Sequence, residues 1–263
     1  MRDISKMDAL RIPPARAIRL RDVLGFESKV RYLVWRCLKA KSQLRVALKS
    51  GLKIILRPPP ARDLTTAHDI FVSEIYDLNP HVDTLGDGLV VDVGANVGYS
   101  CLYFANLLRR NPILAVEPHP VFSAILKQQL DANGFSARTR IAQVAAHVRD
   151  GRALLSDAED SSTIVNIAGT GTYPIEMVDL FALVGSEAVA LLKMDIEGGE
   201  YPILEDPRFE KLNCRMVMLE WHATTDANRG RDWCFDRLRK VGYGARVGKQ
   251  DGTQTGLIVA LRR

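Results

Sequence analysis

The sequence predicts an α/β fold, a doubly wound and mostly parallel seven-stranded sheet, with an N-terminal helix and a β-hairpin as an extension. Two observations predict this fold. Short apolar runs alternate with helical patterns from Leu89 onward, and a glycine turn follows the first of these runs. The chain has 263 residues, of which 47% are hydrophobic, and this is enough for one full α/β core with an appendage.

The first 85 residues precede this alternation. Residues 20–41 predict a helix, with basic side chains on the face opposite to a row of apolar positions. The apolar positions are Val30, Leu33, Val34, Cys37 and Leu38, and the basic ones are Lys29, Arg31, Arg36 and Lys39. Two apolar runs, 44–48 and 52–56, flank a short turn with a glycine and predict a β-hairpin. Asp63 or Thr65 is expected to cap a further helix that reaches Ile75. We therefore divide the chain into a basic helical arm (1–43), a hairpin and helix leading into the core (44–85) and a Rossmann-like domain (86–263).

In the last region strands and helices alternate, which is typical of a parallel sheet covered on both faces. The expected strands are 89–94, 113–117, 139–145, 189–196, 215–221 and 256–262, with a closing hairpin before the last one. The expected helices lie near 98–110, 120–133, 174–185, 200–212 and 229–241. Residues 146–172 are polar and irregular, and we expect them to form a lid over a substrate.

The run 89–98 reads as a buried strand that enters a tight turn at Gly94 and Gly98. Such a turn, at the carboxyl end of a parallel strand, is a floor for a nucleotide-like ligand. The strand carries Asp92, whose carboxylate would repel a pyrophosphate but attract the ammonium and sulfonium groups of S-adenosylmethionine. Glu117 ends the next strand and could bind the ribose hydroxyls of either kind of nucleotide.

A second group of polar residues follows two later strands. Asp195 ends one of them and Glu220 and His222 end the next, so all three should meet at the same opening of the sheet. His222 suits a general base near neutral pH, and Asp195 could also serve or could hold the ammonium of the cofactor. The three could alternatively bind a divalent metal, but they lack a compact ligand spacing and we expect none. Lys193 lies within an apolar strand and needs a carboxylate, for which Glu220 is a candidate.

Charge is distributed unevenly along the chain. Residues 1–60 hold 15 Lys and Arg against 4 Asp and Glu, a net charge of +11, whereas the remainder has −6. Such an arm could contact nucleic acid or anionic lipid, although a solvated helix face is the favoured interpretation. Four scattered cysteines indicate reduced thiols in a cytoplasmic protein, and we expect neither a signal peptide nor a transmembrane segment.

The two groups of motifs, in this order, resemble the FkbM family of S-adenosylmethionine-dependent methyltransferases. The resemblance runs from about Arg45 to the C-terminus, and the block Lys193–Glu200 is its most specific part. It implies a class I, Rossmann-like methyltransferase fold and an O-methyltransferase activity on a hydroxyl of a sugar or glycan or of a secondary metabolite. Gly199 stands where Ala is usual in the family, and Trp221 stands where a smaller aliphatic residue is usual.

The leading hypothesis is therefore an O-methyltransferase with S-adenosyl-L-methionine as cofactor and a small-molecule or glycan hydroxyl as acceptor. The cofactor-binding residues are expected to be Asp92, Gly94, Ala95, Asn96, Gly98, Tyr99, Glu117, Ala145 and Asp195. The catalytic residues are expected to be Asp195, Glu220 and His222. One alternative is an NAD-dependent oxidoreductase, although the turn lacks Gly-x-Gly-x-x-Gly. Another is a non-catalytic binder of nucleic acid or of a membrane surface through the basic arm.

Overall fold

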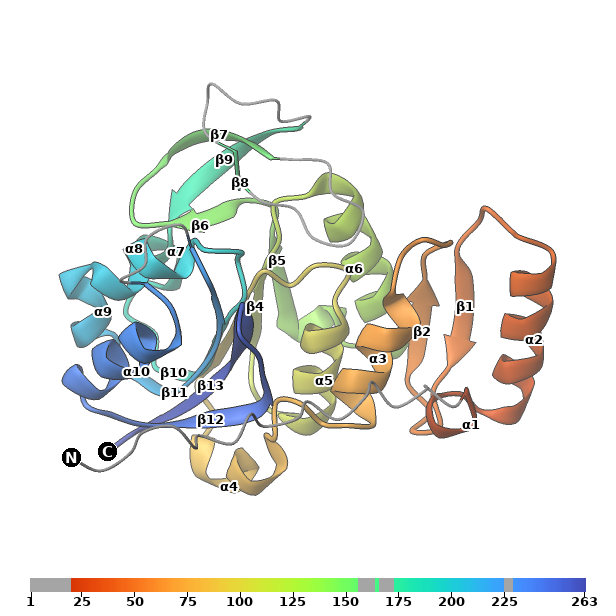
Figure 1. Ribbon diagram of the computed structural model, residues 1–263, viewed down its shortest axis with the longest axis horizontal. Coiled ribbons are helices and arrows are strands. Elements are labelled where there is room, and N and C mark those ends of the chain that lie inside the picture. Colours follow the sequence, from red (N-terminus) through yellow and green to blue (C-terminus); the bar gives the residue numbers. More distant parts are fainter. Residues whose placement is uncertain (1–19, 156–163, 166–172, 225–228) are drawn as a thin grey trace, which may run out of the picture.

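A computed structural model describes residues 20–155, 164–165, 173–224 and 229–263. Its centre is a seven-stranded sheet with the order β12-β13-β11-β10-β3-β4-β5 (Figure 1). The strands are β3 (Leu89–Val93), β4 (Ile113–Val116), β5 (Thr139–Ala142), β10 (Val189–Met194), β11 (Cys214–His222), β12 (Tyr243–Asp251) and β13 (Thr255–Arg262). The first five of these run parallel, and the hairpin β12–β13 adds antiparallel strands at one edge. The predicted seven-stranded, mostly parallel sheet and its closing hairpin are confirmed.

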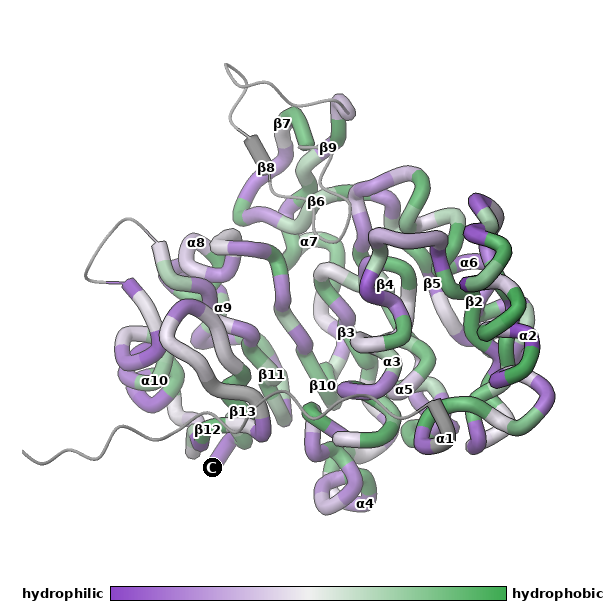
Figure 2. The backbone as a smooth tube through the Cα atoms, turned by 45° about the vertical axis from the view of Figure 1, so that its right-hand side comes forward, coloured by the Kyte–Doolittle hydropathy of each residue, from purple (hydrophilic) through white to green (hydrophobic). Residues whose placement is uncertain are grey.

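Helices cover both faces of this sheet. The helices on one side are α3 (Asp63–Phe71), α5 (Tyr99–Leu107) and α6 (Pro120–Asn133), and those on the other are α7 (Leu180–Val184), α8 (Glu200–Glu205), α9 (Pro207–Lys211) and α10 (Arg231–Lys240). Successive strand residues alternate between the faces, so Val90 packs in one core and Val91 in the other, both with no exposed surface. In Figure 2 hydrophobic stretches mark the inner strands. None of the described helices is long and apolar enough to cross a bilayer.

Two of the predicted helices are wrong in part. In the first, expected at 174–185, residues 173–179 instead form a strand, β9 (Tyr173–Asp179), which pairs with β7 (Gly151–Leu155). Only α7 is helical. It begins after Asp179, which caps it by accepting hydrogen bonds from Phe181 N and Ala182 N. The helix expected at 200–212 is divided into α8 and α9. Asp206 has extended backbone there and caps α9 one residue before Pro207, whose ring cannot continue a helix.

The segment 146–172 is also more ordered than expected. With the neighbouring residues it forms a four-stranded sheet of order β6-β9-β7-β8, in which β6 is Ala145–His147 and β8 is Ile164–Val165. The strand expected at 139–145 therefore ends at Ala142, and the chain enters this second sheet at Ala145. Residues 156–163 and 166–172 of the expected lid lie outside the described residues.

The N-terminal extension consists of α1 (Leu20–Val23), α2 (Phe26–Cys37) and the predicted hairpin of β1 (Leu44–Ala47) and β2 (Lys53–Leu56). Tyr99 Oη donates to Ile55 O at 2.7 Å, and Gln129 Oε1 accepts from Ile55 N at 3.2 Å. These bonds join β2 to α5 and α6. Three details differ from expectation. The helix expected at 20–41 is divided into α1 and α2 and ends at Cys37. α3 ends at Phe71, and Asp63 does not cap it but forms an ion pair with Arg57 (2.6 Å). Residues 1–19 of the basic arm lie outside the described residues.

Candidate active site

A cavity of about 610 Å³ lies at the carboxyl ends of β3, β4 and β10. Its walls combine a few polar groups with apolar side chains, as in sites for small molecules. Glu117, Asp195 and Glu197 supply carboxylates, while Phe122 and Leu155 supply apolar surface. The remaining lining residues are Val93, Gly94, Asn96, Val116, Pro118, Ala145, Ala146 and Ile196.

Glu117 is the most buried acid of this cavity, with 5% of its surface exposed. Oε2 accepts a hydrogen bond from Asn96 N (2.7 Å) and Oε1 accepts one from His119 N (2.8 Å). Burial nevertheless raises the pKa of Glu117 to about 7, because these two bonds only partly offset the loss of hydration. The carboxylate is thus held rigidly and still has lone pairs for hydroxyl donors in the cavity.

The glycine turn between β3 and α5 brings two strand ends together. Gly94 has a φ of +77°, and a Cβ at this position would lie 1.9 Å from Asp195 O. Gly98 has a φ of +98°, and a Cβ there would lie 2.5 Å from Leu126 Cδ1. Both positions therefore require glycine, because each has a left-handed backbone and a close neighbour, Asp195 at Gly94 and α6 at Gly98.

Asp92 lies beneath this turn and lines neither this cavity nor the one described next. It has no exposed surface, and its Oδ2 accepts a hydrogen bond from Ser100 Oγ (2.7 Å). Its other carboxylate oxygen is 3.3 Å from Lys193 Nζ. Lys193 thus has a carboxylate beside it, as predicted, but this carboxylate belongs to Asp92 and not to Glu220. The expected attraction between Asp92 and a cationic ligand is therefore offset by an internal cation.

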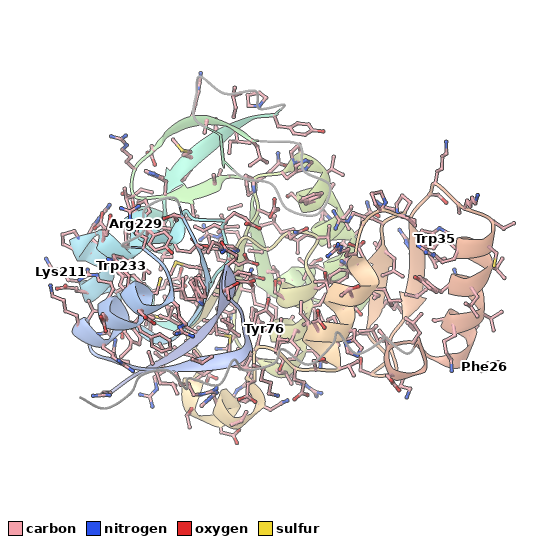
Figure 3. All side chains as sticks on the ribbon, viewed as in Figure 1. Phe26, Trp35, Tyr76, Lys211, Arg229 and Trp233 are labelled. Atoms are coloured by element: carbon pink, nitrogen blue, oxygen red, sulfur yellow. The ribbon has the colours of Figure 1, made fainter. Side chains whose placement is uncertain are left out.

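A second cavity, of about 720 Å³, lies on the other side of the glycine turn. It shares Gly94, Asn96 and Asp195 with the first and extends along the turn towards α3. The residues that line it are Arg57, Arg62, Asp63, Thr66, Ile70, Tyr76, Gly94, Ala95, Asn96, Val97, Gly98, Tyr99, Ser100, Lys193 and Asp195. Figure 3 shows Tyr76 near the middle of the molecule. Tyr76, Arg57 and Arg62 were not among the predicted site residues, because they lie before the glycine motif and carry no signature of their own.

Asp195, Glu220 and His222 come together as predicted. One ligand atom from each lies within 4.8 Å of the others, a separation that a divalent ion could bridge. His222 Nε2 is 3.8 Å from Asp195 Oδ1 and 3.5 Å from Glu197 Oε2. Asp195 lines both cavities, whereas Glu220 and His222 line neither of them.

Glu200 contacts His222 of this cluster and has no exposed surface. Oε1 accepts from Ile196 N (3.0 Å) and Oε2 accepts from Gly198 N (2.8 Å), so the carboxylate fixes the turn after β10. His222 Nδ1 is 3.1 Å from Glu200 Oε1. Glu200 also begins α8, but its chief contacts are with this turn and with His222.

The charges of this cluster change the expected role of His222. Burial acts to lower its pKa, but the hydrogen bond and charge of Glu200, together with Asp195 and Glu197, outweigh it and raise the pKa to about 9. The imidazole is therefore protonated near neutral pH and cannot act there as a general base. The charge of Asp195 and burial raise the pKa of Glu220 to about 7, which places this carboxylate close to its titration point at neutral pH.

Of the other predicted cofactor residues, Gly94, Asn96, Glu117 and Ala145 line the first cavity. Ala95, Gly98 and Tyr99 line the second, and the Tyr99 hydroxyl is already bonded to Ile55 O. The predicted cofactor-binding residues thus line one or both of the two cavities, except Asp92, which is buried and lines neither.

Comparison with known proteins places this site in a family. The model of the FkbM methyltransferase domain matches residues 92–243, which hold the glycine turn, Glu117 and the cluster around Asp195. The chain is 33% identical to AMB antimetabolite synthetase AmbE of Pseudomonas aeruginosa, over 72% of this chain and 11% of that protein. It is 26% identical to methyltransferase 1 of Beauveria bassiana, over 35% of this chain and 36% of that protein. The chain thus spans only a small part of each curated relative.

Among solved structures, methyltransferase FkbM from Methylobacillus flagellatus has 15% identity and a TM-score of 0.48, over 66% of this chain and 43% of that chain. Precorrin-6y C5,15-methyltransferase from Geobacter metallireducens has 14% identity and a TM-score of 0.44, over 72% of this chain and 88% of that chain. The match of the family model over more than half of the chain overrides the oxidoreductase alternative, and the chain belongs to the FkbM methyltransferase domain family.

Proposed function

We propose that the protein is an S-adenosylmethionine-dependent O-methyltransferase. The observation that carries this proposal is the position of Asp195, which lines both cavities while its neighbours form a cluster of carboxylates around one protonated imidazole. Asp195 and Glu197 offer negative charge at the cavity surface, which suits a sulfonium. A pyrophosphate would be repelled by the same charges.

The two cavities fit the two ends of this cofactor. In the first, Glu117 suits the ribose hydroxyls, and Ala145 and Ala146 leave room for a flat base. In the second, the main chain from Gly94 to Gly98 suits the methionine end, and Arg62, which also lines this cavity, suits its carboxylate. Gly94, Asn96 and Asp195 belong to both cavities, so the sulfonium would lie beside Asp195.

When bound, S-adenosylmethionine supplies an electrophilic methyl group on a cationic sulfur. The residues of the chain would then align an acceptor hydroxyl and remove its proton. Asp195 is the acid that lines both cavities, so we assign to it the orientation and deprotonation of the hydroxyl. The negative charge of Asp195 raises the pKa of the nearby Glu220, and the His222 cation would keep the Asp195 carboxylate in place.

The acceptor is proposed to be a hydroxyl on a secondary metabolite or a sugar. The similarity to an antimetabolite synthetase supports the first of these, although this chain spans only 11% of that protein.

Titration calorimetry with S-adenosylmethionine tests the proposal on the full chain. We expect micromolar binding, which Glu117→Ala weakens by about tenfold or more because a charged hydrogen-bond acceptor is lost. Glu187→Ala, an exposed acid outside both cavities, is the matched control and should bind like the wild type. A folded protein that gives no heat with this cofactor would refute the proposal.

A further inference from the structure

The outer face of α2 is apolar. Eight large apolar side chains of the described residues are exposed, and five of them belong to α2 or to the residue that ends it. The exposed fractions are 80% for Phe26, 49% for Val30, 51% for Leu33, 52% for Val34 and 74% for Leu38. These positions follow helical spacing and therefore form one continuous stripe.

This orientation of α2 is fixed by polar contacts on its inner face. Ser28 Oγ accepts a hydrogen bond from Ala47 N (2.8 Å), and Trp35 Nε1 donates to Ser42 O (2.8 Å). Both Ser28 and Trp35 are buried against the hairpin, and Figure 3 shows Trp35 between α2 and β1. The apolar stripe that the sequence predicts for α2 therefore faces away from the protein. Mixed hydrophobic and hydrophilic segments along α2 are visible in Figure 2.

The stripe is bordered by positive charge. Arg31, Arg36, Lys39 and Lys41 are exposed, and the structure, where it describes the chain, gives none of them an ion pair. Lys29 Nζ lies 5.6 Å from the centroid of the Phe26 ring. Residues 20–60, which the structure describes, hold 10 Lys and Arg against Asp22 and Glu27, a net charge of +8, so the field around α2 is positive.

We propose that α2 docks on an anionic membrane surface, with its apolar stripe inserted between lipid headgroups and its basic residues on lipid phosphates. An exposed apolar stripe with flanking cations is typical of interfacial helices, which lie in the membrane plane. Figure 1 places α2 at one end of the long axis of the molecule, where no other described element obstructs its approach to a flat surface.

Charge decides between this partner and two others. Pairing of α2 with α2 of a second copy would bring two strongly basic segments together, which costs free energy. A nucleic acid would satisfy the cations but would leave Phe26, Leu33 and Leu38 in water, since its contacts with such arms are mainly to phosphates. An anionic bilayer satisfies both the apolar and the basic groups.

Flotation of the full-length protein with lipid vesicles tests this inference. Wild-type protein should bind vesicles of phosphatidylglycerol and phosphatidylcholine, should bind pure phosphatidylcholine much less, and should be released by high salt. The variant Phe26→Gln/Leu33→Gln/Leu38→Gln keeps good helix formers at exposed positions and should lower vesicle partitioning by about tenfold or more. The matched control Val121→Gln/Val247→Gln alters two exposed valines elsewhere and should partition like the wild type.

Three outcomes would overturn the inference. They are absence of wild-type binding to anionic vesicles, unchanged binding by the α2 variant, and a wild-type dimer that the α2 variant converts to a monomer. Calorimetry with S-adenosylmethionine on the same variants separates this inference from the proposed function, because substitutions on α2 should leave cofactor binding unchanged.

Discussion

Lys193 lies directly opposite Asp92 in the ladder between β10 and β3, and both side chains are buried. The Lys193 ammonium is 3.3 Å from Asp92 Oδ1, 3.6 Å from Asp195 Oδ2 and 2.7 Å from Gly94 O. Burial acts to lower the pKa of Lys193, but the charges of Asp92 and Asp195 outweigh it and raise the pKa. One cation thus joins the carboxylate under the glycine turn to the carboxylate at the cavity surface.

We predict that Lys193→Met destabilises the protein by about 3–5 kcal/mol, because Asp92 is left buried without its cation. Asp92→Asn/Lys193→Met should recover a large part of this loss, since it removes the uncompensated charge. Urea unfolding measures both changes. Lys127→Met, which breaks the exposed pair of Lys127 with Asp131, is the control and should change stability by less than about 1 kcal/mol. A Lys193→Met protein as stable as this control would contradict the prediction.

The sequence predicts the central sheet well because its signals are local. The apolar run before Gly94 and the run before Asp195 identify parallel strands, and polar residues that follow such strands must share one edge. That is why Asp195, Glu220 and His222 could be brought together without coordinates.

The features that the sequence did not predict depend on contacts between distant segments. Residues 173–179 form a strand because they pair with β7, and the local sequence pattern does not reveal this pairing. The outward orientation of the apolar face of α2 depends on two hydrogen bonds, one with Ala47 of the hairpin and one with Ser42 just before it. The burial of Asp92 and the raised pKa of His222 depend on charges brought in from other strands.

We predict that S-adenosylhomocysteine releases a proton from the protein when it binds near pH 6.5. The pKa of Glu117 is raised to about 7 by burial, so much of this carboxyl is protonated at that pH. Ribose hydroxyls that donate to the carboxylate favour its charged form and lower its pKa, so binding should expel a large fraction of one proton. The neutral sulfur of this ligand leaves the cluster around Asp195 without a new charge.

Calorimetry in buffers with different ionisation enthalpies measures the number of protons released. Glu117→Gln cannot ionise and should abolish the release. The effect should also disappear near pH 9, where Glu117 is ionised before binding. Equal proton release in wild type and Glu117→Gln would show that another group is responsible.

We predict that the preference for S-adenosylmethionine over S-adenosylhomocysteine increases as the pH rises through about 7. Glu220 loses its proton in this range. At a separation of about 6–8 Å in a partly hydrated site, the additional negative charge should increase the affinity for the sulfonium roughly tenfold. The ratio of the two dissociation constants from pH 6 to 8 is the measurement. Glu220→Gln should flatten this step, and a step that survives in this variant would assign the titration to a different residue.

The last prediction concerns metal ions, which the donor spacing of Asp195, Glu220 and His222 permits. At neutral pH the His222 imidazole is protonated, with Nδ1 near Glu200 and Nε2 near Asp195 and Glu197, so neither nitrogen offers a lone pair. A metal must first displace a proton from a group with a pKa of about 9, which weakens binding at pH 7 by about a hundredfold. We therefore expect Mn²⁺ titrations monitored by electron paramagnetic resonance to show weak binding at pH 7, with affinity rising about tenfold per pH unit towards pH 9. Tight stoichiometric binding at pH 7 that His222→Ala abolishes would instead identify this cluster as a metal centre.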